Sequence, residues 1–286
     1  MGNDLMTRVR DKYLTVDGLR LRYLEEGHGP AVLLLHGASL GSSADVFLRN
    51  LGPLGLAGFR AIAFDQPGFG LSDVPVDLSA AYRRDSIPRF MDALSLKTAA
   101  LVGHSQAGNS AVQLALKEPG RCTHVIVLGT GSLLPPLGGE GEGNEAAAQQ
   151  RLERRMAAGE PTVEDTRKML EATLFHRELI TPEELALRHA RSVGRNFEAF
   201  VARNAAAEAA PVKEPKAPLW QRLVDLPMPL LLIFGREDRG HAAERAKLLK
   251  EMYPRLNLHI VPGCRHLVPW DAAGEFVRLG VPFLKS

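Results

Sequence analysis

The residues that could do chemistry in this chain are gathered around one serine. The segment Gly103-His104-Ser105-Gln106-Ala107 follows a short apolar run and precedes a helix-prone stretch. It is a variant of the G-x-S-x-G turn, in which small neighbours permit a sharp, strained backbone and leave the serine hydroxyl exposed above a sheet. A serine that merely caps a helix gives a similar string. We interpret Ser105 as a nucleophile because a buried strand runs directly into the following helix.

A serine hydroxyl is a weak nucleophile, so it needs a base and an acid that orients the base. Where this turn occurs, the three residues follow in the order serine, acid, histidine. One later apolar run ends in Gly235-Arg236-Glu237-Asp238, and the last apolar run ends shortly before His266. The Gly-x-x-Asp spacing favours Asp238, and Glu237 is the competing acid. The sequence therefore predicts Ser105, Asp238 and His266 as a catalytic triad.

A third segment, His36-Gly37-Ala38, follows the apolar run 31–35 and could stabilise negative charge. A backbone N–H in such a turn points at the carbonyl under attack, as does the N–H of the residue after the nucleophile. We therefore expect the N–H groups of Ala38 and Gln106 to form an oxyanion hole. His36 is expected to brace this loop rather than to transfer protons.

The elements that must position these residues alternate between strands and helices. A hairpin is predicted around Asp17-Gly18, a dipeptide suited to a type I′ turn. The apolar runs that follow lack polar alternation, which is typical of strands buried on both faces of a parallel sheet. These runs are 31–35, 59–64, 99–102, 124–128, 230–234 and 258–261, with helix-prone stretches at 80–94, 107–117, 242–252 and 272–284. The pattern predicts an α/β fold in which helices flank a mostly parallel central sheet.

One interval interrupts this alternation. Residues 133–218 contain no convincing strand and instead hold helix-prone segments at 144–158, 162–175, 182–193 and 195–209. We predict a helical lid or cap here, inserted into a core formed by residues 1–132 and 219–286. The alternative is an additional helical layer without a role in catalysis.

Composition and charge limit the partners and the location. The chain has 286 residues, and its 35 basic and 33 acidic side chains nearly balance, so neither nucleic acid nor an anionic membrane is expected as a partner. Its two cysteines form no zinc or redox pair. No apolar run has the length of a signal peptide or of a membrane span. We expect a cytoplasmic protein that acts on a small substrate without a metal or organic cofactor, with homo-oligomerisation as an open possibility.

From about residue 13 to residue 284 the sequence resembles the α/β-hydrolase family. The motifs around the three triad residues and the turn at 65–73 carry this resemblance. Within that family it is similar to the meta-cleavage product hydrolases, which hydrolyse a carbon–carbon bond in vinylogous 1,5-diketones from aromatic ring cleavage. Segments within 67–73, 129–133, 179–188 and 270–284 carry this resemblance. It implies that Arg188, on the predicted lid, binds the dienoate carboxylate of the substrate. A solvated helix arginine is the alternative.

The chain departs from that family's pattern near the expected site. His104 precedes the nucleophile where the family usually has asparagine, and Leu267 follows the catalytic histidine where tryptophan is usual. The glycine- and proline-rich oxyanion loop of the family is replaced by Ala38-Ser39-Leu40-Gly41-Ser42. We expect Ser39, His104 and Leu267, together with Arg188, to bind the substrate.

Three functions are compatible with the sequence. The first is carbon–carbon bond hydrolysis of a dienoate, in which the resemblance implies that His266 first helps to ketonise the substrate. The second is a carboxylesterase or lactonase that uses the same triad on small apolar esters and needs no anion clamp. The third is a ligand receptor built on a hydrolase fold. The intact triad argues against the third function, and the resemblance favours the first.

Overall fold

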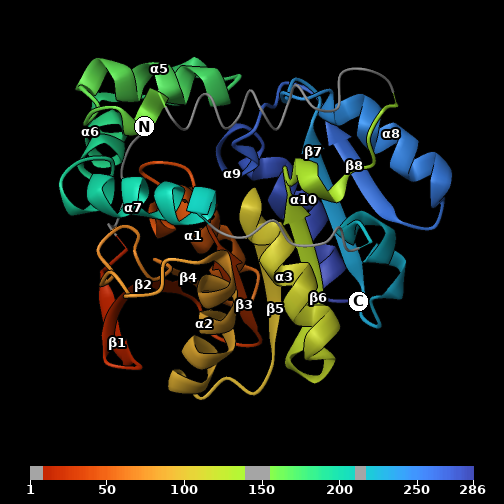
Figure 1. Ribbon diagram of the computed structural model, residues 1–286. Helices are drawn as coiled ribbons and strands as arrows, with labels where there is room; N and C mark the ends of the chain where they lie inside the picture. The colour runs from red at the N-terminus through yellow and green to blue at the C-terminus, as the bar shows by residue number, and fades with distance from the viewer. Residues whose placement is uncertain (1–8, 139–154, 210–216) are drawn as a thin grey trace, which may run out of the picture.

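Eight strands form one sheet in the computed structural model, which describes residues 9–138, 155–209 and 217–286 (Figure 1). The strands are β1 (Lys12–Val16), β2 (Leu19–Glu26), β3 (Ala31–Leu35), β4 (Arg60–Phe64), β5 (Ala99–His104), β6 (Cys122–Leu128), β7 (Leu230–Gly235) and β8 (Asn257–Val261). Their order in the sheet is β1-β2-β4-β3-β5-β6-β7-β8. β2 is antiparallel to both β1 and β4, and every other neighbouring pair is parallel. The predicted mostly parallel sheet is therefore confirmed.

The hairpin between β1 and β2 turns at Asp17 and Gly18, as predicted. Their φ angles are 50° and 80°, and a type I′ turn requires positive φ at both positions. Val16 consequently faces Leu19 across the strand pair. This hairpin forms the antiparallel edge of the sheet.

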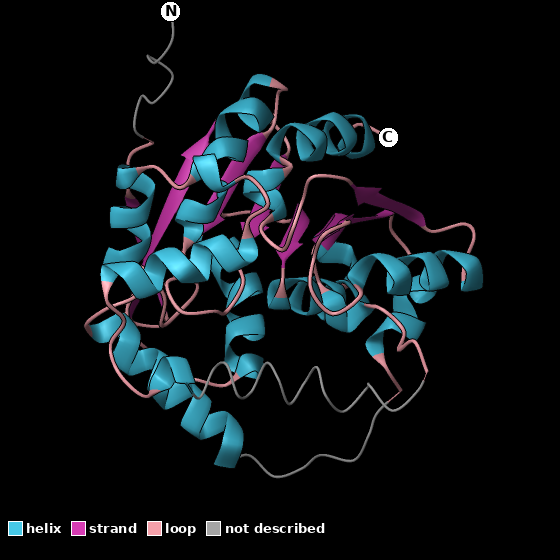
Figure 2. Ribbon diagram, turned by 90° about the horizontal axis from the view of Figure 1, so that it is seen from above, coloured by secondary structure: helices cyan, strands magenta, loops and turns pink. Residues whose placement is uncertain are grey.

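Helices cover both faces of the sheet (Figure 2). They are α1 (Leu48–Leu56), α2 (Ala80–Ala93), α3 (Gln106–Lys117), α8 (Ala242–Met252), α9 (Val268–Asp271) and α10 (Ala273–Leu284). Apolar side chains of α2, α3 and α8 pack on one face, and those of α1, α9 and α10 pack on the other. Short 3₁₀ segments complete the connections: η1 (Ala44–Phe47), η2 (Pro119–Arg121), η3 (Gly131–Leu133), η4 (Arg177–Leu179) and η5 (Leu219–Asp225).

Helix α1 is absent from the elements predicted from the sequence. Its residues include Gly52, Pro53 and Gly55, which all lower intrinsic helix propensity. Leu51 and Leu54 are fully buried in the core between α1 and the sheet. Tertiary packing therefore outweighs local propensity in this segment.

The described part of residues 133–218 forms no strand, in agreement with the sequence. It contains α5 (Val163–Thr173), α6 (Pro182–Ala190) and α7 (Arg195–Ala209), while most of the helix predicted at 144–158 lies outside the described residues. A capping box between Thr162 and Asp165 begins α5, and Thr181 caps α6. The three helices gather near the end of the sheet where the parallel strands terminate (Figure 1).

Three further observations concern the described residues as a whole. None of their helices has both the length and the apolar character needed to cross a bilayer. No group of three His, Cys, Asp or Glu side chains among them is arranged to hold a metal ion. Cys122 and Cys264 are both buried and both free.

Candidate active site

Ser105 lies in the turn between β5 and α3 with an unusual backbone conformation. Its φ is 56° and its ψ is −130°, a strained combination for a residue that carries a Cβ. The Ser105 N–H donates to Leu128 O at 2.9 Å, and the Gly108 N–H donates to Ser105 O at 3.0 Å. A Cβ at Gly103 would lie 2.6 Å from Ala107 O, so the turn requires glycine there. The backbone thus forms the sharp strand-to-helix turn that the sequence predicts.

His266 and Asp238 lie in line with Ser105. His266 Nε2 is 2.9 Å from Ser105 Oγ, and His266 Nδ1 is 3.1 Å from Asp238 Oδ2. The His266 side chain is 15% exposed and that of Asp238 is 5% exposed, so little water reaches the contact between them. Asp238 follows β7 and His266 follows β8, and these neighbouring parallel strands end at the same edge of the sheet. The structure therefore brings the three predicted residues into hydrogen-bond contact.

Glu237, the competing acid, has other partners. Its Oε2 accepts a hydrogen bond from the Cys264 N–H at 3.0 Å, and its Oε1 accepts one from Arg236 Nε at 3.2 Å. The Glu237 N–H also donates to Cys264 O. Glu237 therefore links the loop after β7 to the loop after β8. Of the two acids, Asp238 is the one whose carboxylate contacts His266.

The predicted oxyanion segment passes directly beside the serine. A Cβ added to Gly37 would lie 3.0 Å from Ser105 Cβ and 3.4 Å from Ser105 Oγ. Ala38 follows Gly37, and Gln106 is the first residue of α3, where backbone N–H groups have no partner within the helix. Among the described residues, no hydrogen bond from either N–H is present. Both N–H groups are therefore available to an oxyanion beside Ser105.

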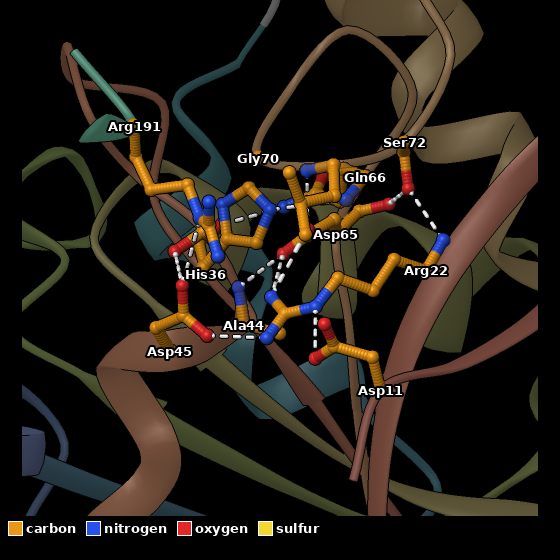
Figure 3. A network of polar contacts seen from close by, with 12 residues as sticks. Asp11, Arg22, His36, Ala44, Asp45, Asp65, Gln66, Gly70, Ser72 and Arg191 are labelled. Carbon is orange, nitrogen blue, oxygen red and sulfur yellow. Dashed lines mark hydrogen bonds and ion pairs between the residues drawn. The ribbon is translucent and has the colours of Figure 1, made fainter. Parts of the chain in front are cut away.

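A buried ion network holds the chain that follows this segment (Figure 3). Arg22, on β2, donates to Asp45 at 2.6 Å and to Asp65 at 3.2 Å. Asp65 also accepts a hydrogen bond from the Ala44 N–H at 2.6 Å. Since Asp65 follows β4 directly, the network ties the loop after β3 to β2 and to the end of β4. This connection gives the oxyanion segment a rigid support.

His36 braces the same loop, as expected. The Gln66 N–H donates to His36 Nε2 at 3.0 Å, so the ring proton lies on Nδ1, which donates to Gly37 O at 2.6 Å. The Gln66 side-chain amide donates to His36 O at 2.6 Å. Burial lowers the pKa of His36 to about 3. The imidazole is therefore neutral and serves as a fixed hydrogen-bonding group.

His104 and Leu267 both support the loop that carries His266. His104 Nε2 donates to the backbone oxygen of His266 at 2.9 Å, and burial lowers the pKa of His104 to about 3. The Leu267 N–H donates to Thr173 O, at the end of α5, at 3.1 Å. Leu267 also lines, with Arg188, a cavity of about 20 Å³, enough for one water molecule. That His104 and Leu267 contact the substrate stays a prediction.

Arg188 reaches the oxyanion loop from α6. Its Nη2 donates to Leu40 O at 2.8 Å and to Ser39 Oγ at 3.3 Å. No carboxylate of the described chain forms an ion pair with its guanidinium. Burial lowers the pKa of Arg188 to about 10, a value at which the group is still charged at neutral pH. Arg188 is thus a partly desolvated cation beside Ser39, and the alternative of a solvated helix arginine does not describe it.

Other arginines fasten α6 and α7 to the core. Arg191 Nε donates to Asp45 at 3.0 Å (Figure 3), and Arg195 Nη2 donates to Ser72 O at 3.1 Å. The helices of residues 133–218 are therefore held against the loops that follow β3 and β4.

Sequence reasoning missed two buried arginines near this site. Arg83, on α2, donates to the Gln106 side chain at 2.9 Å, and Arg203, on α7, donates to Gly68 O at 2.8 Å. Nothing in the sequence distinguishes them from the other arginines of these helices. The one available signal was Phe69, an apolar residue in a glycine-rich turn, which both guanidinium groups contact.

Comparisons with known proteins identify the family of this chain. Residues 30–273 match the family described as alpha/beta hydrolase fold. A 2-hydroxy-6-oxo-6-phenylhexa-2,4-dienoate hydrolase of Burkholderia cepacia is 32% identical over 99% of this chain and 99% of the relative. A 2-hydroxy-6-oxononadienedioate/2-hydroxy-6-oxononatrienedioate hydrolase of Burkholderia vietnamiensis is also 32% identical, over 96% of this chain and 95% of the relative.

A solved structure gives the same result. A meta-cleavage product hydrolase from Pseudomonas fluorescens superposes with a TM-score of 0.76 at 26% identity, covering 97% of this chain and 98% of the other. The chain therefore belongs to the α/β-hydrolase family, is a hydrolytic enzyme, and has meta-cleavage product hydrolases among its relatives.

Proposed function

We propose that the protein is a serine hydrolase that cleaves a carbon–carbon bond in a dienoate product of aromatic ring cleavage. The observation that carries this proposal is a partly desolvated cation, Arg188 of α6, which forms no ion pair with a described carboxylate and contacts the loop beside Ser105, His266 and Asp238. A carboxylate that leaves water needs a partner, and a guanidinium pairs with a planar anion bidentately. The names of the two Burkholderia relatives, both dienoate hydrolases, support the same substrate class.

In the proposed mechanism, His266 first moves the proton of the substrate's C2 enol to C5, so that C2 becomes a ketone conjugated with the remaining double bond, while C6 is already the ketone that is attacked. His266 then takes the proton of Ser105 Oγ, which attacks the ketone carbon. Asp238 holds the imidazole tautomer and stabilises its positive charge. The N–H groups of Ala38 and Gln106 receive the oxyanion, and the loss of one such donor typically costs about 3 kcal/mol.

The carbon–carbon bond then breaks, and its electron pair passes to the conjugated carbonyl of the departing dienoate. His266 returns its proton to this leaving group. Water, deprotonated by His266, hydrolyses the remaining ester on Ser105 and regenerates the hydroxyl.

The test of this proposal is a ratio measured on two substrates. Arg188→Gln is compared with wild type by kcat/KM, on a dienoate and on a neutral aryl ester. Loss of a partly buried partner of a carboxylate should cost several kcal/mol, or about 10²-fold or more, on the dienoate. The ester carries no anion and should lose little.

The matched control is Arg177→Gln, because Arg177 is an exposed arginine in η4, shortly before the helix α6 that carries Arg188. It should leave both substrates unaffected. An equal, small effect of Arg188→Gln on both substrates, with faster turnover of the ester, would favour an esterase over the dienoate hydrolase.

A further inference from the structure

A second cavity adjoins the oxyanion segment on the side of α2. Its volume is about 290 Å³, and its wall includes His36, Gly37, Ala38, Gln66, Arg83 and Gln106. Gly37 approaches Ser105, and Ala38 and Gln106 carry the two N–H groups assigned above to the oxyanion. A group bound in this cavity would therefore lie next to the carbonyl that Ser105 attacks.

One buried cation lines this cavity and a second lies close behind it. Arg83, in the cavity wall, is 9% exposed, and Arg203, which does not line the cavity but shares the Phe69 ring with Arg83, is 8% exposed. The hydrogen bonds of Arg83 go to the Gln106 side chain at 2.9 Å and to Leu78 O at 3.5 Å, and that of Arg203 goes to Gly68 O. All of these acceptors are uncharged. In the ranges that the structure describes, no carboxylate pairs with either guanidinium.

The two guanidinium groups share one aromatic neighbour. Arg203 lies 3.9 Å from the centroid of the Phe69 ring, and Arg83 lies 5.6 Å from it. Burial, with the charge of Arg83 as a further cause, lowers the pKa of Arg203 to about 9. Contacts with one ring offset part of the cost of desolvation, but two like charges buried together stay unfavourable without an anion. A charge arrangement that the fold alone does not favour is typical of a binding site.

We propose that this cavity binds a second carboxylate of the substrate, so that the enzyme acts on dienoates with a carboxylate at each end. The inference rests on the proposed function and specifies its substrate class. Arg188 contacts the loop at Ser39, while Arg83 contacts Gln106, beyond the serine. The reacting ketone would lie between them, with its dienoate end toward Arg188 and its acyl end toward Arg83 and Arg203.

The names of the relatives describe the two possibilities. One acts on a 6-phenyl dienoate, whose acyl end is apolar, and the other acts on a dienedioate, whose acyl end carries a second carboxylate. A phenyl group supplies no charge to the two arginines, whereas a carboxylate would pair with Arg83 and offset the repulsion between Arg83 and Arg203. The charge of the cavity therefore favours the dienedioate class.

The test uses two dienoates that differ only beyond the reacting ketone, 2-hydroxy-6-oxo-6-phenylhexa-2,4-dienoate and 2-hydroxy-6-oxononadienedioate. Wild type should prefer the dienedioate in kcat/KM by about 10-fold or more. Arg83→Gln and Arg203→Gln should each lower kcat/KM on the dienedioate by about 10-fold or more and leave the phenyl substrate within about twofold. The control is Arg89→Gln, on the same helix, where the arginine is paired with Asp17 at 3.1 Å; it should change neither substrate.

Two outcomes would overturn the inference while leaving the proposed function intact. One is a wild-type preference for the phenyl substrate. The other is an equal loss on both substrates in a folded Arg83→Gln, which would show that Arg83 only positions Gln106. Arg83→Lys keeps the positive charge but not the guanidinium. If the charge binds the second carboxylate, this variant should recover part of the kcat/KM on the dienedioate. If Arg83 only positions Gln106, the variant should recover activity on neither substrate.

Failure of the proposed function has a different signature, namely turnover of neither dienoate. Calorimetric titration with succinate, the acyl product of the dienedioate, then decides the question of the anion site alone. Binding to wild type that Arg83→Gln abolishes supports the site, and absence of binding to wild type overturns it.

Discussion

At the residue scale, the site combines a strained serine with a shielded imidazole. The positive φ of Ser105 is imposed by the turn between β5 and α3, and the surrounding hydrogen bonds maintain it. His266 is held from three sides, by Asp238, by Ser105 and, through its backbone oxygen, by His104. Single substitutions here are therefore expected to change the chemistry much more than the fold.

Ser105→Ala should fold normally and lose about 10³-fold or more in kcat, because the hydroxyl is removed while the turn keeps its backbone. The measurements are turnover of the dienoate and the thermal unfolding midpoint. Near-normal turnover by the folded variant would remove Ser105 from the mechanism.

Asp238→Asn should also fold, and it should lose about 10⁴-fold in kcat because an amide does not hold the required tautomer of His266. Glu237→Gln is the matched control, since its oxygen can still accept the Cys264 N–H. Its kcat should stay close to that of wild type. If Glu237→Gln loses most of its kcat and Asp238→Asn keeps it, Glu237 rather than Asp238 is the acid.

The predictable part of the site consists of residues that follow strands. Ser105, Asp238 and His266 each come soon after an apolar run, and parallel strands bring such positions to one edge. Arg83 and Arg203 could not be found this way. Their role depends on the packing of α2 and α7 around Phe69, and an apolar residue in a glycine-rich turn was the one sequence signal of that packing.

At the element scale, the strands were easier to predict than the helices that pack against the sheet and its loops. The apolar run 31–35 coincides with β3, and the other predicted parallel strands differ from the observed ones by one or two residues at an end. Helix α1 was missed because burial, rather than propensity, holds its glycine-rich sequence together. The docking of α6 on the core was also unpredictable, since it depends on Asp45, which accepts from Arg22 and from Arg191.

Asp45→Asn should destabilise the protein by about 3 kcal/mol, because it leaves two largely buried guanidinium groups without their shared carboxylate. The side chains of Asp45, Arg22 and Arg191 are only 8%, 4% and 12% exposed. The measurement is the free energy of unfolding in urea. Asp85→Asn, at a carboxylate 43% exposed that pairs with Arg84, is the control and should change stability by less than about 1 kcal/mol. Similar effects of the two substitutions would show that Asp45 does not hold the elements together.

At the scale of the whole molecule, the carboxyl edge of the sheet contains two buried histidines that burial keeps neutral. His36 and His104 lie there with their pKa values lowered by burial from the ordinary 6.5 to about 3. The folded protein therefore binds no proton at either imidazole at pH 5, whereas the unfolded chain does. By linkage, stability is lost as the pH falls from about 6.5 toward about 3.

Each of these imidazoles should cost about 2 kcal/mol of stability between pH 7 and pH 5, since one pKa unit corresponds to about 1.4 kcal/mol. His104→Asn removes one of them, and an asparagine amide can still donate toward the backbone oxygen of His266. Its free energy of unfolding should consequently fall less than that of wild type between pH 7 and pH 5, by about 2 kcal/mol. The measurement is urea unfolding at pH 7, 6 and 5, with His28→Asn as the control, because His28 is exposed in the loop between β2 and β3. Wild type and His28→Asn should lose stability in parallel. If His104→Asn loses as much as they do, the acid sensitivity of the molecule arises elsewhere, and His104 is not the neutral buried group that its surroundings indicate.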